Sequence, residues 1–122
     1  MAGVVHIPWY ATGFRGDRLE AALADVGPVA LRYGATSHAL YRYQDDRYKF
    51  LQMAEFASYE QWERYWNGQE FTDFRVLCSG WYQVPVLYGW SDLVAAGALE
   101  PEEAVHSSHG LADAAPTGDL AG

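Results

Sequence analysis

FLQMAEFASYEQW, residues 50–62, contains the change from strand to helix on which the predicted fold depends. Residues 47–56 form a strand-like run rich in aromatic and apolar side chains. Ser58 is followed three residues later by Gln61, a capping-box pattern that predicts the start of a helix. Beyond it, Trp62 and Trp66 lie four residues apart and therefore share one helical face. The stretch thus predicts a strand that leads into an aromatic-rich helix.

Further elements are predicted on both sides of this transition. The helix is interrupted at Asn67-Gly68 and then continues as a second helical piece. Gly27-Pro28 marks the end of an earlier helix. The order is strand, helix, strand, strand, helix, strand, and these elements are expected at residues 4–10, 17–26, 37–43, 47–56, 58–80 and 84–90. This order predicts an α+β chain with the ferredoxin-like split βαβ fold and a four-stranded antiparallel sheet.

The two central strands are expected to pair through a tight turn centred on Asp45-Asp46. The predicted pairs are Tyr43 with Tyr48, Tyr41 with Phe50, and Ala39 with Gln52. This register places Tyr41 and Gln52 on one face of the sheet and His38 on the other. A three-residue loop would exchange the faces, because neighbouring strand residues point to opposite sides.

Charge divides the 122 residues into two expected parts. Residues 1–92 hold 11 acidic and 8 basic side chains, a net charge of −3, and are assigned to one folded domain. Residues 93–122 hold five acidic side chains and neither Lys nor Arg, so they are assigned to an acidic, Ala- and Gly-rich tail. Neither part offers the basic surface that nucleic acid or an anionic membrane requires. These two classes of partner are therefore not expected.

The remaining composition predicts a cytoplasmic protein without a metal site. Cys78 is the single cysteine, so no internal disulfide can form, which suits a reducing compartment. The N-terminus lacks the basic region of a secretion signal, and no apolar run reaches the roughly 20 residues that span a bilayer. His106 and His109 have metal-like spacing, but without further ligands nearby they are assigned to a loop.

Residues 50–62, followed by EFTDF at residues 70–74, resemble the dimeric α/β barrel superfamily, and within it the antibiotic biosynthesis monooxygenases. The resemblance implies a homodimer in which the sheets of two protomers form the barrel. Haem-degrading and quinol-oxidising relatives typically carry a histidine on the second helix, where this sequence has Tyr65. Ala54 and Phe56 stand in place of an acid and a tryptophan of that pattern. Neither haem nor another cofactor is therefore expected.

The sequence itself also favours a dimer. Both faces of the central hairpin are expected to carry apolar side chains, whereas the helices of one split βαβ unit cover a single face. On one face these are Tyr41, Phe50 and Phe56, and on the other Leu40, Leu51 and Met53. The uncovered face is expected to require a second copy of the chain.

Cofactor-independent oxygenation of a small aromatic or polyketide-like substrate is the predicted function. Such a reaction needs an apolar slot, a general base and donors that stabilise a substrate anion. His38 is the candidate base, with His6 as the alternative, and Arg42 is the candidate partner of a phenolate. The predicted catalytic residues are His38, Arg42 and Tyr65, and the predicted substrate-binding residues are Tyr41, Tyr48, Gln52, Trp62 and Trp66.

Two other functions fit the same residues. A polyketide cyclase or isomerase would use the pocket and a base without oxygen, and a non-catalytic protein would bind a small ligand or only dimerise. Each aromatic candidate also has an ordinary structural role: Trp62 and Trp66 as core, Tyr41 and Tyr48 as cross-strand partners. The sequence leaves open whether the rings surround a ligand or fill the interior.

Overall fold

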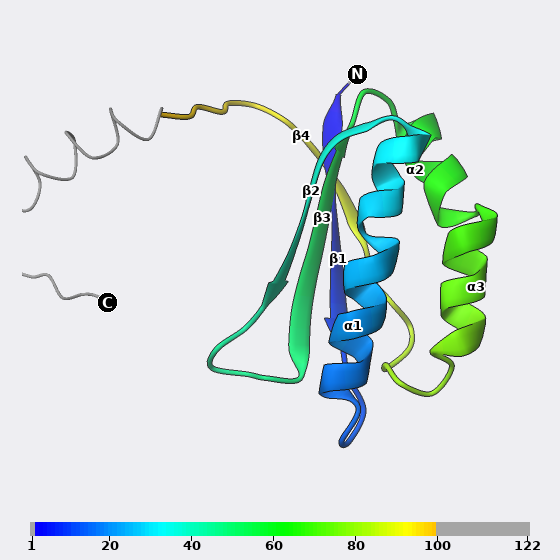
Figure 1. Cartoon of the computed structure of the whole chain (residues 1–122). Coiled ribbons are helices and arrows are strands. Elements are labelled where there is room, and N and C mark those ends of the chain that lie inside the picture. Colours follow the sequence, from blue (N-terminus) through cyan, green and yellow to red (C-terminus); the bar gives the residue numbers. More distant parts are fainter. Residues whose placement is uncertain (1, 100–122) are drawn as a thin grey trace, which may run out of the picture.

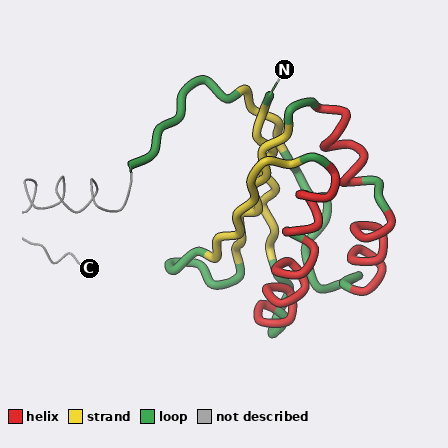
Figure 2. Tube along the Cα trace, turned by 45° about the horizontal axis from the view of Figure 1, so that its top comes forward, coloured by secondary structure: helices red, strands yellow, loops and turns green. Residues whose placement is uncertain are grey.

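Four strands form one antiparallel sheet in the order β2-β3-β1-β4, and the helices pack on one of its faces (Figure 1). The computed structural model describes residues 2–99. Its elements are β1 (Gly3–Tyr10), α1 (Gly16–Val26), the 3₁₀ helix η1 (Pro28–Tyr33), β2 (Ala35–Arg42), β3 (Lys49–Phe56), α2 (Tyr59–Trp66), α3 (Gln69–Leu77) and β4 (Gly89–Asp92). This arrangement confirms the α+β ferredoxin-like fold. Figure 2 shows the helices on the same side of the strands from a second direction.

The helix that follows β3 begins where the capping pattern predicts. The Ser58 hydroxyl accepts a hydrogen bond from the Gln61 amide at 3.3 Å, and the Gln61 side chain accepts one from the Ala57 amide at 3.0 Å. The first contact satisfies an amide donor that the first helical turn leaves free, and the second ties the residue before the cap to the helix. The break between α2 and α3 lies at Asn67 and Gly68, as expected. Tyr33 of η1 packs so closely against Gly68 that a β-carbon there would collide with its hydroxyl.

The predicted hairpin register is wrong by one residue. The structure pairs Leu40 with Gln52 and Tyr41 with Leu51. Asp46 causes the shift: its side chain accepts a hydrogen bond from the Tyr48 amide at 3.2 Å and its carbonyl accepts one from the Lys49 amide at 3.0 Å, which lengthens the connection. Consequently His38, Leu40 and Arg42 share the helix-covered face with Gln52, and Tyr41 lies on the opposite face.

The last strand begins later than residues 84–90 predict. β4 covers Gly89–Asp92 and pairs only with the first part of β1, ending opposite His6. Two residues further along β1 is Pro8, which has no amide hydrogen to donate to a neighbouring strand. The ladder between β1 and β4 therefore stops before Pro8, and residues 84–88 have neither helix nor strand structure.

Aromatic rings fill the space between the sheet and the helices. The largest side chains that are fully or almost fully buried are Trp9, Trp62, Tyr65, Phe50, Phe56 and Phe71. Phe71 lies at the centre of this group, with ring centroids 4.9 Å from Tyr65 and 4.8 Å from Trp66. Separations of this size are those of rings in direct contact. The aromatic residues of α2 and α3 thus form the core of the domain.

The edge strand β2 is irregular where the chain enters it. Its register against β3 shifts between Ala35 and Ser37, as in a β-bulge. The side chains at this irregularity and directly after it are polar and exposed, at Thr36, Ser37 and His38.

Candidate functional site

A chain of hydrogen bonds crosses the interior and joins four elements. The Trp9 indole N–H of β1 donates to the Gln52 side-chain oxygen of β3 at 3.0 Å. The Gln52 amide donates to the Tyr65 hydroxyl of α2 at 3.1 Å, and that hydroxyl donates to the Val26 carbonyl of α1 at 2.6 Å. Burial raises the pKa of Tyr65 well above its usual value, and the Gln52 hydrogen bond offsets this only in part. Tyr65 therefore stays neutral and ties the helices to the sheet.

Trp62 differs from these neighbours because its polar atom has no partner. The side chain is fully buried, and its indole N–H makes no hydrogen bond among residues 2–99. The ring is enclosed by Phe56, Trp66 and Tyr88, whose ring centroids lie 6.3, 5.3 and 4.9 Å away. A buried donor without an acceptor costs about 1–3 kcal/mol, so its presence calls for an explanation.

Two phenols lie next to the Trp62 indole at the surface of the domain. Tyr59 and Tyr88 are 40% and 38% exposed. Interaction with the Tyr88 hydroxyl is the main cause that raises the pKa of Tyr59, while a contact with the Trp62 indole, which lacks hydrogen-bond geometry, lowers it. We call Tyr59, Trp62 and Tyr88 the donor cluster.

Trp66 extends the donor cluster along α2. Its ring is half-buried, with the Tyr88 centroid 5.3 Å away on one flank. On another flank the guanidinium carbon of Arg75 lies 4.7 Å from the ring centroid. One Arg75 nitrogen is buried without a hydrogen-bond partner, and its cation faces the indole instead. We call the donor cluster together with Trp66 and Arg75 the aromatic rim. Arg75 provides a cation at one end of it, and Tyr59 and Tyr88 provide hydroxyls at the other.

Arg42 is fully engaged in contacts within the chain. Its guanidinium donates to Asp17 at 2.8 Å and Glu20 at 2.7 Å, and also to the Arg47 carbonyl at 2.8 Å. Hydrogen bonding to Asp17 is the main cause that raises the pKa of Arg42. These contacts fasten β2 and the hairpin turn to α1. The residue predicted to hold a phenolate therefore acts as a clamp between two elements.

The remaining predicted residues lie outside the core. His38 is exposed on the edge strand, Tyr48 is exposed at the hairpin turn, and Tyr41 is exposed on the uncovered sheet face. A hollow of about 280 Å³ lies beside this strand, lined by Val4, Ser37, His38, Ala39, Tyr41, Met53, Ala54 and Glu55. His6, the alternative base, lies on the uncovered face with its Nδ1 3.5 Å from the Ser91 hydroxyl.

The eight predicted site residues thus fall into two groups. Gln52, Trp62, Tyr65 and Trp66 come together around α2, whereas His38, Tyr41, Arg42 and Tyr48 lie on β2 and the hairpin turn. Sequence reasoning missed Tyr59, Tyr88 and Arg75. Tyr59 lies three residues before Trp62 on the same helix, and this spacing could have found it, whereas Arg75 and Tyr88 approach α2 only through the tertiary fold.

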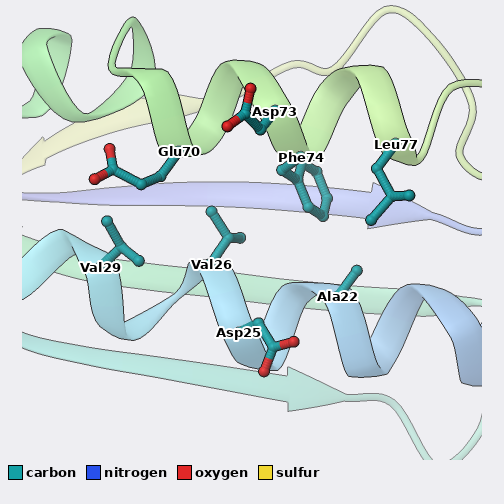
Figure 3. Close-up of a pocket in the computed structure, with 8 residues that line it drawn as sticks. All are labelled: Ala22, Asp25, Val26, Val29, Glu70, Asp73, Phe74 and Leu77. Atoms are coloured by element: carbon teal, nitrogen blue, oxygen red, sulfur yellow. The ribbon is translucent and has the colours of Figure 1, made fainter.

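A separate groove lies between α1 and α3 on the outer side of the helices (Figure 3). It measures about 390 Å³ and is lined by Ala22, Asp25, Val26, Val29, Glu70, Asp73, Phe74 and Leu77. In Figure 3, Phe74 and Leu77 point from α3 toward Val26 and Ala22 of α1. The groove therefore has an apolar floor and acidic side chains on both bounding helices, and none of the eight predicted residues lines it.

The described residues contain neither a metal-binding cluster nor a membrane-spanning helix. Within residues 2–99 no three His, Cys, Asp or Glu side chains are grouped so as to hold a metal ion. His106 and His109, like most of the acidic tail, lie outside the described residues. A bilayer-crossing helix would need a longer apolar run than any described helix provides.

Comparison with solved structures finds the same fold at low sequence identity. SnoaB from Streptomyces nogalater, a cofactor-independent oxygenase, is 14% identical with a TM-score of 0.67, covering 78% of this chain and 95% of its own. A structure named antibiotic biosynthesis monooxygenase is also 14% identical, with a TM-score of 0.67 and coverage of 78% and 100%. PA3566 from Pseudomonas aeruginosa is 18% identical, with a TM-score of 0.68 and coverage of 78% and 97%.

Comparisons by sequence give no match. No family model matches the chain, and none of the curated proteins matches it. The structural likeness therefore establishes the fold that the resemblance predicted, shared with SnoaB and with a structure named antibiotic biosynthesis monooxygenase.

Proposed function

We propose that the protein is a homodimeric, cofactor-independent monooxygenase that acts on a small aromatic, polyketide-like substrate at the aromatic rim. The observation that carries this proposal is the buried Trp62 indole N–H, which has no partner among residues 2–99 and lies beside two half-exposed phenols. The shared fold with SnoaB, a cofactor-independent oxygenase, supports the class of chemistry.

The donor cluster is suited to hold the oxygen atom of a flat ligand. A substrate ring would lie against Trp66, with its oxygen accepting hydrogen bonds from the Trp62 indole and the two tyrosine hydroxyls. The raised pKa of Tyr59 keeps that hydroxyl protonated, so it remains a donor. Access to Trp62 requires Tyr88 to turn aside, and Tyr88 lies in a segment without helix or strand structure.

Catalysis would come from stabilising the substrate anion. Hydrogen bonds to the charged form of a phenol or enol lower its pKa, which raises the fraction of electron-rich anion at neutral pH. Oxygen then takes electrons from that anion. For an anthrone, a ring methylene becomes a carbonyl, one oxygen atom enters the product and the other leaves as water. The proton departs to solvent at the half-exposed rim, because His38 and His6 both lie on other parts of the sheet.

The proposed dimer uses the face of the sheet that the helices leave bare (Figure 1). Val4 and Pro8 of β1 and Leu51 and Met53 of β3 are half-exposed apolar residues on this face. Contiguous apolar surface of this kind marks an interaction site in soluble proteins. A second copy would cover it and complete a barrel.

Oxygen consumption with an anthrone substrate tests the function. Trp62→Phe removes the indole N–H and keeps an aromatic ring. We expect kcat to fall at least tenfold, because removing one buried donor to a developing anion typically lowers kcat by a factor of roughly 10²–10³. The midpoint of the pH–rate profile should move upward, because the substrate anion loses a donor. Trp81→Phe, a half-buried tryptophan outside the donor cluster, is the matched control with unchanged rates. Equal activity of Trp62→Phe and wild type contradicts the proposal.

A non-catalytic ligand-binding dimer is the second candidate. It is favoured by the interior, where the Gln52 and Tyr65 side chains are hydrogen-bonded to each other, to the Trp9 indole and to the Val26 carbonyl. In that case an anthraquinone quenches tryptophan fluorescence, while no oxygen is consumed with any anthrone or hydroquinone. A cyclase or isomerase would instead form product without oxygen.

A further inference from the structure

Phe14 is held in an unusual conformation and points into solvent. The residue is 98% exposed and has a φ of 62°, in the left-handed region that bulky side chains rarely adopt. It occupies the third position of the turn Thr12–Arg15, which is closed by a 3.1 Å hydrogen bond from the Arg15 amide to the Thr12 carbonyl. Glycine ordinarily fills that position, yet Gly13 lies one residue earlier. A strained backbone that presents an apolar ring to solvent indicates a contact that the isolated chain does not make.

Basic side chains surround this exposed ring. Arg15 and Arg18 line one hollow together with Phe14, and Arg47 lines a second one, in which Arg42 is paired with Asp17. None of these three arginines forms an ion pair within the described part of the chain, whereas Arg42 nearby is paired with two acids. We call Phe14 with Arg15 and Arg18 the basic tip.

The groove between α1 and α3 has the complementary character. Its floor is apolar, and at about 390 Å³ it has room for a phenyl ring (Figure 3). Asp25 and Asp73 at its margins form no ion pair within the described residues. Leu77 at one end is 66% exposed. The groove therefore combines an open apolar surface with unpaired negative charge.

We propose that the basic tip of one copy inserts Phe14 into the α1–α3 groove of a second copy. Arg15 and Arg18 would then meet Asp25 and Asp73, so that opposite charges surround the buried ring. The contact lies between copies because Phe14 precedes α1 and points into solvent, whereas the groove extends from Ala22 to Val29. Residues 100–122 are poor occupants of the groove, since they carry five acidic side chains and no Lys or Arg.

This contact differs from an interface with two-fold symmetry. Tip and groove are different surfaces, so each copy that binds a neighbour still presents a free tip or a free groove. Successive contacts therefore build a ring or an open chain of copies. The bare sheet face remains available, so this assembly and the proposed sheet dimer are independent.

Sedimentation velocity of the full chain over a range of concentrations tests the proposal. Phe14→Gly removes the ring and suits a positive φ, so the variant should melt no lower than wild type while losing the concentration-dependent rise in mass. Leu77→Asp should abolish the same rise from the groove side. Val76→Asp is the matched control, because Val76 is 73% exposed on the same helix but does not line the groove.

A charge exchange gives the second arm of the test. Arg15→Glu with Arg18→Glu, and separately Asp25→Lys with Asp73→Lys, should each lose self-association. A chain that carries all four substitutions should regain it, because the opposite charges again face each other. Equal mass of wild type and Phe14→Gly at every concentration overturns the proposal, as does failure of the fourfold variant to reassemble.

Discussion

Trp9 and Tyr10 are neighbours on β1 but belong to very different surfaces. Trp9 is 1% exposed under the helices, whereas Tyr10 is 38% exposed on the bare face of the sheet. The same alternation continues along β3, where Gln52 is buried and Met53 is half-exposed. The chain therefore completes one face of its sheet by itself and leaves the other unfinished. Stability is concentrated on the covered face, and association is expected on the bare one.

Of the substitutions considered, removal of the buried Trp9 ring should cause the largest loss in the free energy of unfolding. Trp9→Ala deletes a side chain in contact with Trp66, Phe71, Phe74 and Tyr82 and leaves the Gln52 oxygen without its donor. We expect a loss of about 3–5 kcal/mol in the free energy of unfolding. Tyr10→Ala, one residue away, should cost less than about 1 kcal/mol. Urea denaturation measures both, and equal losses would contradict the division between the faces.

An intermediate effect is expected from a single hydroxyl. Tyr65→Phe keeps the ring but leaves the Gln52 amide and the Val26 carbonyl without their partner. Two buried groups lose a hydrogen bond, so the expected loss is about 2–3 kcal/mol. Tyr41→Phe on the bare face is the control and should change the free energy of unfolding by less than about 0.5 kcal/mol. Similar values for the two variants would mean that the interior chain of hydrogen bonds contributes little.

The smallest effect concerns association. Met53→Asp puts a charge at the centre of the bare face, and we expect the dissociation constant of the dimer to rise at least tenfold, about 1.4 kcal/mol. Met53→Leu, which keeps the apolar character, should leave it unchanged. Equilibrium sedimentation in the Phe14→Gly background isolates this interface from contacts of the basic tip. An unaltered dimer in Met53→Asp would show that the bare face is not the interface.

Local patterns account for what the sequence predicts well. The order of elements follows from apolar periodicity and from glycine and proline at the breaks, and the cap at Ser58 forms because Gln61 lies three residues beyond it. Ferredoxin-like topology follows from that order. The element boundaries and the cap depend on neighbouring residues and not on contacts between distant parts of the chain.

Contacts between distant residues account for what the sequence could not supply. The hairpin register depends on how the Asp46 side chain folds the turn, and one residue of difference moves Tyr41 to the opposite face. From the sequence alone Arg42 is a reasonable partner for a phenolate, but in the structure its guanidinium is paired with Asp17 and Glu20 of α1. Tyr88 joins the donor cluster because the final strand starts at Gly89 and leaves residue 88 over α2.

The bulge at the start of β2 has a consequence for solubility. A regular edge strand offers a row of free amide and carbonyl groups on which foreign strands can build, which leads to fibrous aggregates. Here the register shift between Ala35 and Ser37 interrupts that row, and β4 at the other edge is only four residues long. Lateral growth of the sheet is therefore hindered at both edges, which favours contacts between copies through their faces.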